Sequence, residues 1–349
     1  MARLSFSDRL LRWYDQFGRH DLPWQQQRSP YRVWLAEIML QQTQVATVIP
    51  YYLRFMQAFP DVASLATAPL ERVLELWSGL GYYSRARNLH KAARVIAAEF
   101  DGEFPNNIDQ VVALPGIGQS TAGAILAQAR QQRHAILDGN VKRVLCRYHA
   151  VEGWPSKAAV QKQLWRYAEQ HTPDERVDDY TQAIMDLGTT VCTRSSPRCQ
   201  QCPLQIDCIA HGRNHVKRYP SPRPRKALPI KAVRFLILTD RATGRVMLEK
   251  RPPSGIWGGL WSLPEADLDD DIQRLCQQRW DMKVLGNQDQ RAFRHSFSHY
   301  HLDITPCRVQ VQAIGSAVND QGEVTWCCSQ DAVQRALATP VARIIREHA

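Results

Sequence analysis

Residues 114–118 read Leu114-Pro115-Gly116-Ile117-Gly118 and separate two runs whose apolar residues recur at helical spacing. Glycine tolerates backbone conformations that most residues cannot adopt, so the two glycines predict a tight turn between two helices. Such a turn leaves backbone N–H groups exposed at the start of the second helix, where phosphate binds well. A simple connection between helices has the same pattern, so the stretch alone leaves both interpretations open.

Outward from this turn, the sequence predicts helices and no strand from residue 1 to about residue 211. Many short amphipathic runs with brief connections favour a compact all-helical domain over a long bundle. The runs cover residues 10–17, 34–39, 44–58, 61–78, 84–99, 118–130, 139–150, 156–170 and 178–191.

The character of the sequence changes between residues 212 and 229, where prolines alternate with lysines and arginines. Proline at this density disfavours helix and predicts an extended interdomain linker, basic enough to touch phosphates, although a plain solvated linker has the same composition. Residues 230–349 then mix strand-like and helical patterns. Strands are expected at 233–239, 245–249 and within 293–311, and helices at 268–280 and 331–347, which predicts an α+β domain.

The bulk composition favours a polyanionic partner. Lys and Arg outnumber Asp and Glu by 44 to 34 in 349 residues, a net charge of +10 that suits DNA, RNA or an acidic membrane surface. No apolar run is long enough for a membrane helix, and no apolar leader opens the chain, so we expect a cytoplasmic protein with reduced thiols.

Four of the nine cysteines lie close together, at Cys192, Cys199, Cys202 and Cys208. Four thiolates at this spacing can close around one metal centre, either zinc or a [4Fe–4S] cluster. Zinc sites more often combine two short cysteine pairs, and here only Cys199 and Cys202 form one. The spacing therefore favours an iron–sulfur cluster.

Two carboxylates stand in unusual sequence contexts. Glu37 lies inside an apolar helical stripe, where partial desolvation would raise its pKa and let it act as a general acid; at the edge of the stripe it would instead reach water. Asp138 directly precedes a predicted helix, and its ordinary role would be to cap that helix. One carboxylate could also serve both as a cap and in catalysis.

Three segments, 35–45, 77–89 and 137–145, resemble the MutY adenine glycosylase family almost residue for residue. The hairpin at 114–118, the aspartate twenty residues after Gly118 and the cysteine spacing resemble the wider helix–hairpin–helix superfamily that includes endonuclease III. The resemblance covers essentially the whole chain. It implies a multidomain α and α+β protein: a helical glycosylase domain with an iron–sulfur loop at 1–211, a linker at 212–229 and a Nudix-like (MutT-like) domain at 230–349.

The resemblance implies a division of chemistry between the two carboxylates. Glu37 would protonate N7 of adenine, and ionised Asp138 would stabilise the cationic sugar that forms as the glycosidic bond breaks. Ser120 stands where endonuclease III-type enzymes carry a lysine that forms a Schiff base, and the next lysine, Lys142, lies beyond Asp138. A hydroxyl cannot form that base, so we expect a glycosylase without strong lyase activity.

The resemblance also implies which residues meet the nucleic acid. Gln42 and Tyr82 would fill the gap left by the flipped base, Trp24 and Arg32 would line the adenine pocket, and the hairpin and the cysteine loop would contact the DNA backbone. The backbone contacts expected are Gly116, Gly118, Ser120, Arg194 and Arg198.

Residues 258–265, Gly-Gly-Leu-Trp-Ser-Leu-Pro-Glu, resemble the start of a Nudix box, but the glutamate-rich helix that should follow is missing. Magnesium binding and pyrophosphate hydrolysis are therefore not expected. The domain instead resembles a lesion sensor in which Phe297, Ser298 and His299 recognise 8-oxoguanine opposite adenine.

The sequence thus predicts a monomeric DNA repair enzyme of the bacterial nucleoid that acts on double-stranded DNA with 8-oxoguanine:adenine or guanine:adenine mispairs and does not bind membranes. One alternative is a bifunctional glycosylase/lyase, against which Ser120, Glu37 and the additional domain argue. The other is a non-enzymatic iron–sulfur DNA-binding protein, against which Glu37 and Asp138 argue.

Overall fold

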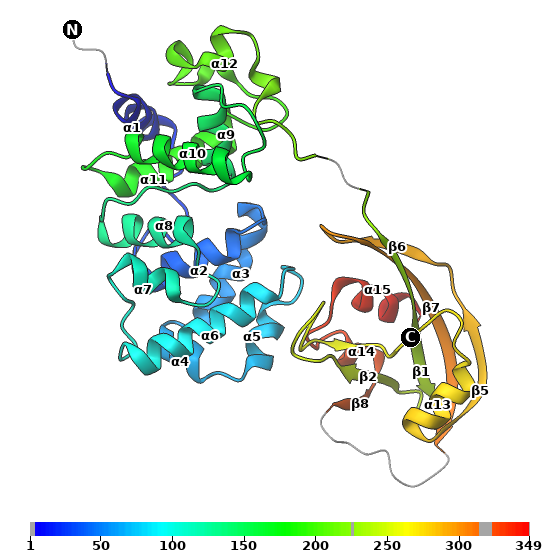
Figure 1. The fold of residues 1–349 in the computed structure, drawn as a ribbon. Coiled ribbons are helices and arrows are strands. Elements are labelled where there is room, and N and C mark those ends of the chain that lie inside the picture. Colours follow the sequence, from blue (N-terminus) through cyan, green and yellow to red (C-terminus); the bar gives the residue numbers. More distant parts are fainter. Residues whose placement is uncertain (1–3, 225–226, 314–322, 349) are drawn as a thin grey trace. The chain divides into compact units, whose positions relative to one another are not determined.

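The structure is a computed structural model that describes residues 4–224, 227–313 and 323–348 (Figure 1). The chain divides into two compact units, one made of Met1–Thr67 and Asn88–Arg225, the other of Ala68–Arg87 and Lys226–Ala349. The first unit is helical, and the second contains the strands. The expected architecture, a helical region followed by an α+β domain, is confirmed.

The first unit consists of helices joined by short connections. Its α-helices are α1 (Phe6–Phe17), α2 (Pro30–Leu40), α3 (Val45–Ala58), α4 (Val62–Thr67), most of α6 (Ser84–Glu99), α7 (Ile108–Ala113), α8 (Gln119–Arg130), α9 (Gly139–Tyr148), α10 (Ala158–His171), α11 (Val177–Asp186) and α12 (Ile209–Gly212). A π-helical turn, η1 (Leu187–Val191), and 3-10 turns η2 (Cys199–Gln201), η3 (Gln205–Asp207) and η4 (Val216–Arg218) complete it.

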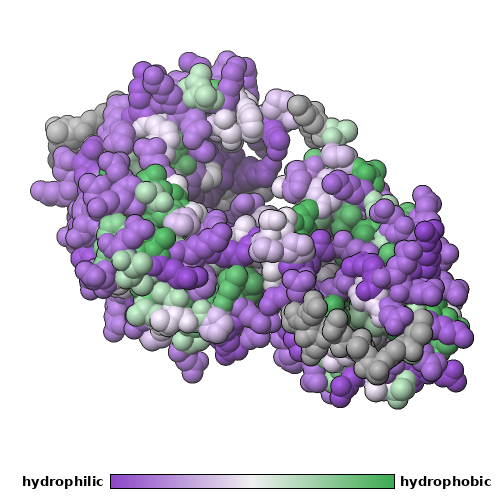
Figure 2. Space-filling model, turned by 60° about the horizontal axis from the view of Figure 1, so that its bottom comes forward, coloured by the Kyte–Doolittle hydropathy of each residue, from purple (hydrophilic) through white to green (hydrophobic). Residues whose placement is uncertain are grey.

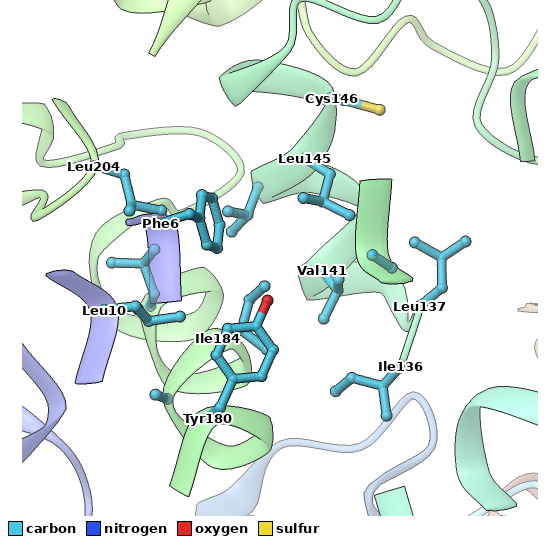
Figure 3. Packing of buried hydrophobic residues seen from close by; sticks show 14 of the residues in the cluster. Phe6, Leu10, Ile136, Leu137, Val141, Leu145, Cys146, Tyr180, Ile184 and Leu204 are labelled. Atoms are coloured by element: carbon cyan, nitrogen blue, oxygen red, sulfur yellow. The ribbon is translucent and has the colours of Figure 1, made fainter. Parts of the chain in front are cut away.

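Apolar side chains of α1, α9 and α11 form one hydrophobic core of this unit (Figure 3). Leu137 and Val141, on either side of Asp138, are both buried in it. Burying a side chain of this size stabilises a fold by about 2 kcal/mol. The core therefore anchors the start of α9 and with it the position of Asp138.

The linker begins later than residue 212. Tyr219 is buried in the core of the helical unit, and its carbonyl accepts a hydrogen bond from Arg147 Nε at 3.0 Å. The hydroxyl of Ser221 accepts a bond from the backbone N–H of Gly153 at 3.1 Å. Buried contacts and satisfied polar groups thus extend the helical unit to Ser221, which composition alone did not indicate.

The second unit is built on one mixed sheet with the strand order β3-β2-β1-β7-β5. Strands β1 and β7 run parallel and pair from Ile230–His301 to Asp240–Val311, whereas the other pairs are antiparallel. Strands β4, β6 and β8 pair with β1, β7 and β2. The elements are β1 (Ile230–Asp240), β2 (Val246–Lys250), β3 (Trp261–Ser262), β4 (Glu265–Ala266), α13 (Ile272–Trp280), β5 (Met282–Asp289), β6 (Phe293–Ser296), β7 (His301–Ala313), β8 (Val324–Cys327), α14 (Ser329–Ala332) and α15 (Thr339–His348).

Helix α5 (Leu70–Trp77) and the turn after it group with this sheet unit, although the sequence assigned them to the helical domain. The indole N–H of Trp261 donates to Glu71 at 2.8 Å, and the hydroxyl of Tyr83 donates to the carbonyl of Leu337 at 2.8 Å. These contacts join residues far apart in the sequence, and helical periodicity predicts only local structure.

Hydrophilic residues cover most of the face seen in Figure 2, with apolar side chains scattered among them. None of the helices formed by the described residues combines the length and the apolar character that crossing a membrane requires.

Candidate active site

The turn between α7 and α8 has the geometry that the sequence predicted for one of its glycines. Gly116 has a φ of 81°, and a Cβ there would lie 2.7 Å from Cβ of Asn88. Any side chain would thus be strained and would collide. Gly118 is the N-cap of α8 with a φ of −97°, so its conformation does not require glycine. No side chain caps this end of α8.

Asp138 is the N-cap of α9, as one of the two interpretations predicted. Its Oδ1 accepts a hydrogen bond from the backbone N–H of Val141 at 2.8 Å, and its Oδ2 accepts one from Nδ2 of Asn140 at 3.1 Å. Hydrogen bonds of this kind and the positive end of the helix both favour an ionised carboxylate.

Glu37 lies on α2, a helix whose other central residues are buried and which packs against α8. The pKa of Glu37 is raised to about 7: burial raises it most, the negative charge of Asp138 raises it as well, and a hydrogen bond from Gln128 lowers it. A carboxyl group with this pKa holds its proton for a large fraction of the time near neutral pH.

The structure brings Glu37 and Asp138 to one site, close enough for the charge of Asp138 to act on Glu37. Burial raises the pKa of Asp138 as well, against the lowering effect of its bonds to Val141 and Asn140 and of the Arg143 charge. Asp138 therefore has more groups that stabilise its anion than Glu37 has. The hydrogen bonds at the site therefore favour the negative charge on Asp138 more than on Glu37.

A series of hydrogen bonds runs from Asp138 to the cysteine loop. Asn140, which donates to Asp138, accepts a bond from Nη2 of Arg143 at 2.8 Å. Arg143 also donates to the carbonyls of Gly188, at 2.6 Å, and Cys192, at 2.8 Å. The guanidinium thus fixes the carboxylate site and the first cysteine to the same helix, α9.

The four predicted cysteine ligands line one pocket of the helical unit. Arg147, a buried residue that also lines this pocket, donates to Sγ of Cys192 at 3.3 Å and to the carbonyl of Thr193 at 2.7 Å. No group of three cysteine, histidine or acidic side chains within the described ranges is arranged to hold a single metal ion.

The two residues predicted to fill the gap in the DNA are both exposed and both have left-handed backbones. Gln42 follows the C-cap of α2 and has a φ of 59°, and Tyr82 has a φ of 50° and is 51% exposed. Such conformations are costly for residues with a Cβ, and they persist where the surrounding structure enforces them.

The remaining predicted nucleic-acid residues differ in their surroundings. Arg194 and Arg198 are exposed, and Nη2 of Arg198 donates to the carbonyl of Thr190 at 2.7 Å. Trp24 is buried, with its ring 5.4 Å from that of Tyr52, and Arg32 donates to the Tyr52 hydroxyl at 3.5 Å. Nothing in these contacts brings Trp24 to the carboxylate pair.

Phe297, Ser298 and His299 form the turn that joins β6 to β7. The backbone N–H of Phe297 donates to the carbonyl of Tyr300 at 2.9 Å, which closes the turn, and Ser298 and His299 are exposed at its tip. The Phe297 ring packs beside Trp257 and Tyr300, with centroids 5.4 Å and 4.7 Å away. Aromatic packing thus fixes the base of the turn. Ser298 and His299 are exposed, and the His299 ring also packs against that of Tyr300, with centroids 4.9 Å apart.

The acidic residues near the Nudix-like segment have structural partners. Asp271 caps α13, whose own sequence contains no acidic residue, and Glu265 pairs with Arg251. Among the site residues that sequence reasoning missed, Gln128 contacts Glu37 and Trp257 packs on Phe297. The sequence feature that could have identified Gln128 is a glutamine inside an otherwise apolar helical run.

A tight turn between two helices that requires glycine, a capped aspartate and a second carboxyl group of raised pKa are features expected of a helix–hairpin–helix DNA glycosylase. Residues 35–170 match the HhH-GPD superfamily of base excision DNA repair proteins, and residues 234–347 match the NUDIX domain. The chain belongs to the adenine DNA glycosylase family, and it acts on DNA as an adenine glycosylase in base excision repair.

The relatives that show this match the chain almost from end to end. Adenine DNA glycosylase of Buchnera aphidicola subsp. Baizongia pistaciae is 39% identical over 99% of this chain and 97% of its own. The Homo sapiens adenine DNA glycosylase is 35% identical over 98% of this chain and 73% of its own. A thermostable thymine-DNA glycosylase structure covers 60% of this chain and 95% of its own, with 27% identity and a TM-score of 0.55.

Proposed function

We propose that Glu37 is the general acid and Asp138 the stabilising anion of adenine excision. Protonation of N7 makes adenine a good leaving group, and the positive charge that develops at C1′ lies opposite a carboxylate held by its helix cap. Water then takes the place of the base. The observation that supports this division is the raised pKa of Glu37, about 7, in the field of Asp138.

The test is the rate of adenine release from one 8-oxoguanine:adenine oligonucleotide, read as strand breaks after alkali. Glu37→Gln and Asp138→Asn should each reduce the single-turnover rate by roughly 10²-fold or more and leave mismatch binding largely intact. Glu169→Gln is a matched control, because Glu169 is exposed and pairs only loosely with Arg133, at 3.7 Å. Near-normal rates in both site variants would reject the assignment.

We propose that the enzyme is monofunctional and works as a monomer on 8-oxoguanine:adenine and guanine:adenine mispairs in the bacterial nucleoid. Ser120 supplies a hydroxyl where a Schiff base would need an amine. Borohydride should therefore trap little covalent complex with DNA. Trapping at high yield would support the bifunctional alternative.

The four cysteines Cys192, Cys199, Cys202 and Cys208 fit a [4Fe–4S] cluster. All four line one pocket, and four thiolates that share one space are the ligand set of such a cluster. Only Cys199 and Cys202 form the short pair that zinc sites usually repeat. The cluster would be structural and would shape the loop that carries Arg194 and Arg198. Brown protein with four irons per chain is expected; stoichiometric zinc would contradict the iron assignment.

A further inference from the structure

Gln128 is a buried polar residue in direct contact with the proposed acid. It lies on α8 after an uninterrupted run of buried residues, its side chain is 3% exposed, and its Nε2 donates a hydrogen bond to Oε1 of Glu37 at 3.2 Å. Helices α2 and α8 pack against each other, so both side chains are held from rigid elements.

An amide at this position costs stability that an apolar side chain would not. Burying an amide is unfavourable unless its polar atoms are bonded, and leucine has a similar size and an equal or better helix propensity. The bond to Glu37 is the contact that compensates for this burial. It is also the one side-chain hydrogen bond that contributes to the pKa of Glu37 among the described residues.

We propose that Gln128 is a positioning residue that directs the proton of Glu37 toward the adenine. An N–H that occupies Oε1 leaves Oε2 to carry the proton of the neutral acid. This inference rests on the proposed role of Glu37 as the acid, and it adds which oxygen delivers the proton and what assists its release.

The same hydrogen bond assists the transfer itself. When the O–H bond of Glu37 breaks and the N–H bond at N7 forms, the electron pair stays on the carboxyl group, which becomes an anion. A hydrogen bond to an anion is stronger than one to a neutral acid. Gln128 therefore stabilises the product of proton transfer more than the starting acid, and such differential stabilisation lowers the barrier.

The groups around Glu37 shift its pKa in opposite directions, and Gln128 is the group that lowers it. Burial and the Asp138 charge raise the pKa of Glu37, whereas the Gln128 amide lowers it, with a net value of about 7. Among the described residues, Asp138 is the charged group that acts on Glu37, from the loop before α9, and α8 contributes the amide. Without the amide, Glu37 would hold its proton to higher pH and release it less readily.

The experiment is the single-turnover rate of adenine excision by the full-length holoenzyme between pH 5.5 and 9, normalised to active enzyme. Gln128→Leu should move the alkaline limb of the profile upward by about one pH unit. It should also lower the plateau rate by about tenfold, because the acid is no longer oriented. Gln128→Met, an apolar side chain of similar length, is the second variant should the leucine protein fold poorly.

Thr172→Val is the matched control, since Thr172 is also buried and donates to the carbonyl of Ala168 at 2.8 Å, at the end of a different helix. It should lower stability and leave the alkaline limb in place. An unmoved limb in both Gln128 variants, with or without a lower plateau, overturns the positioning role. Full activity of Glu37→Gln would instead overturn the proposed function, so the two failures are distinguishable.

Discussion

The hydroxyl of Ser120 accepts a hydrogen bond from the backbone N–H of Leu137 at 2.9 Å, which ties the first turn of α8 to the residue directly before Asp138. The side chain at this position therefore does more than replace an amine. It holds the loop that carries Asp138, the proposed stabilising anion, to the helix that follows the turn at 114–118.

Ser120→Ala should leave the N–H of Leu137 without this acceptor. The expected loss of stability is about 1 kcal/mol, and the excision rate should fall by about tenfold because the Asp138 carboxylate shifts. Ser120→Thr keeps the hydroxyl and serves as the control. Thermal unfolding and single-turnover kinetics measure the two effects; equal rates for the alanine and wild-type proteins would show that the bond does not position Asp138.

The raised pKa of Glu37 predicts a stability cost that depends on pH. Its pKa is about 7 in the folded protein against 4.5 ordinarily, so folded and unfolded chains are both protonated below pH 4.5 and differ above it. As pH rises toward 7, the unfolded state loses its proton first and becomes relatively more stable. Folding stability is thus lost between pH 4.5 and 7, by about 3 kcal/mol in all.

Glu37→Gln removes this ionisation and should raise the melting temperature at pH 8 while changing it little at pH 5. Thermal unfolding of both proteins at the two pH values measures the difference. Glu169→Gln, at an exposed carboxylate, should show no such pH dependence. A stabilisation of Glu37→Gln that is the same at both pH values would contradict a desolvated acid.

The sequence predicted local features of this site better than its assembly. A polar residue before an apolar helical run is enough to expect the Asp138 cap, because capping involves only the next three residues. The meeting of Glu37 with Asp138 followed only from family resemblance, since nothing local relates α2 to the start of α9. The contact between Gln128 and Glu37 could not be predicted from local sequence either, because packing between α2 and α8 brings the two side chains together.

Element boundaries failed where proline or a turn interrupts a continuous pattern. The helix expected at 331–347 is two helices, and Pro340 stands in the first turn of α15, where a missing N–H costs nothing. The strand expected within 293–311 is β6 and β7, separated by the turn at Phe297–Tyr300. Alternation continues through such a turn, so hydropathy did not reveal the part proposed to read the lesion.

Arg85 supports the turn that presents Tyr82. It is 7% exposed, its guanidinium lies 5.4 Å from the ring centroids of both Trp77 and Tyr82, and it donates to the carbonyl of Gly81 at 3.1 Å. Arg85→Leu should release the Tyr82 ring and weaken binding to mismatched DNA by about five- to tenfold, the range of a partly desolvated cation–π contact.

The measurement for Arg85 is the dissociation constant for mismatched DNA in a catalytically inactive background, compared with that for a fully paired duplex. Arg72→Gln is the control, because Arg72 is exposed on the same segment and pairs with Glu75. If Arg85 acts through Tyr82, adding Arg85→Leu to Tyr82→Ala should cause little further loss. Additive losses would separate the two residues.

The exposed tip of the β6–β7 turn predicts where discrimination between lesions resides. Ser298 and His299 are exposed in a turn whose base is fixed by the rings of Phe297, Trp257 and Tyr300, and the His299 ring lies 4.9 Å from that of Tyr300. Neither residue belongs to a strand, so both can be changed without disturbing the sheet. Ser298→Ala combined with His299→Ala should reduce the preference for 8-oxoguanine:adenine over guanine:adenine by about tenfold, as expected when hydrogen bonds to one base are lost.

The preference is the ratio of kcat/KM values for the two mispairs, measured with the intact protein. Thr243→Ala, in the exposed turn between β1 and β2, should leave it unchanged. Trp257→Ala should act in the same direction as the double variant, because the turn then loses one of the rings at its base. A double variant that slows both mispairs equally would place Ser298 and His299 in general DNA binding and remove the lesion-sensing role from this turn.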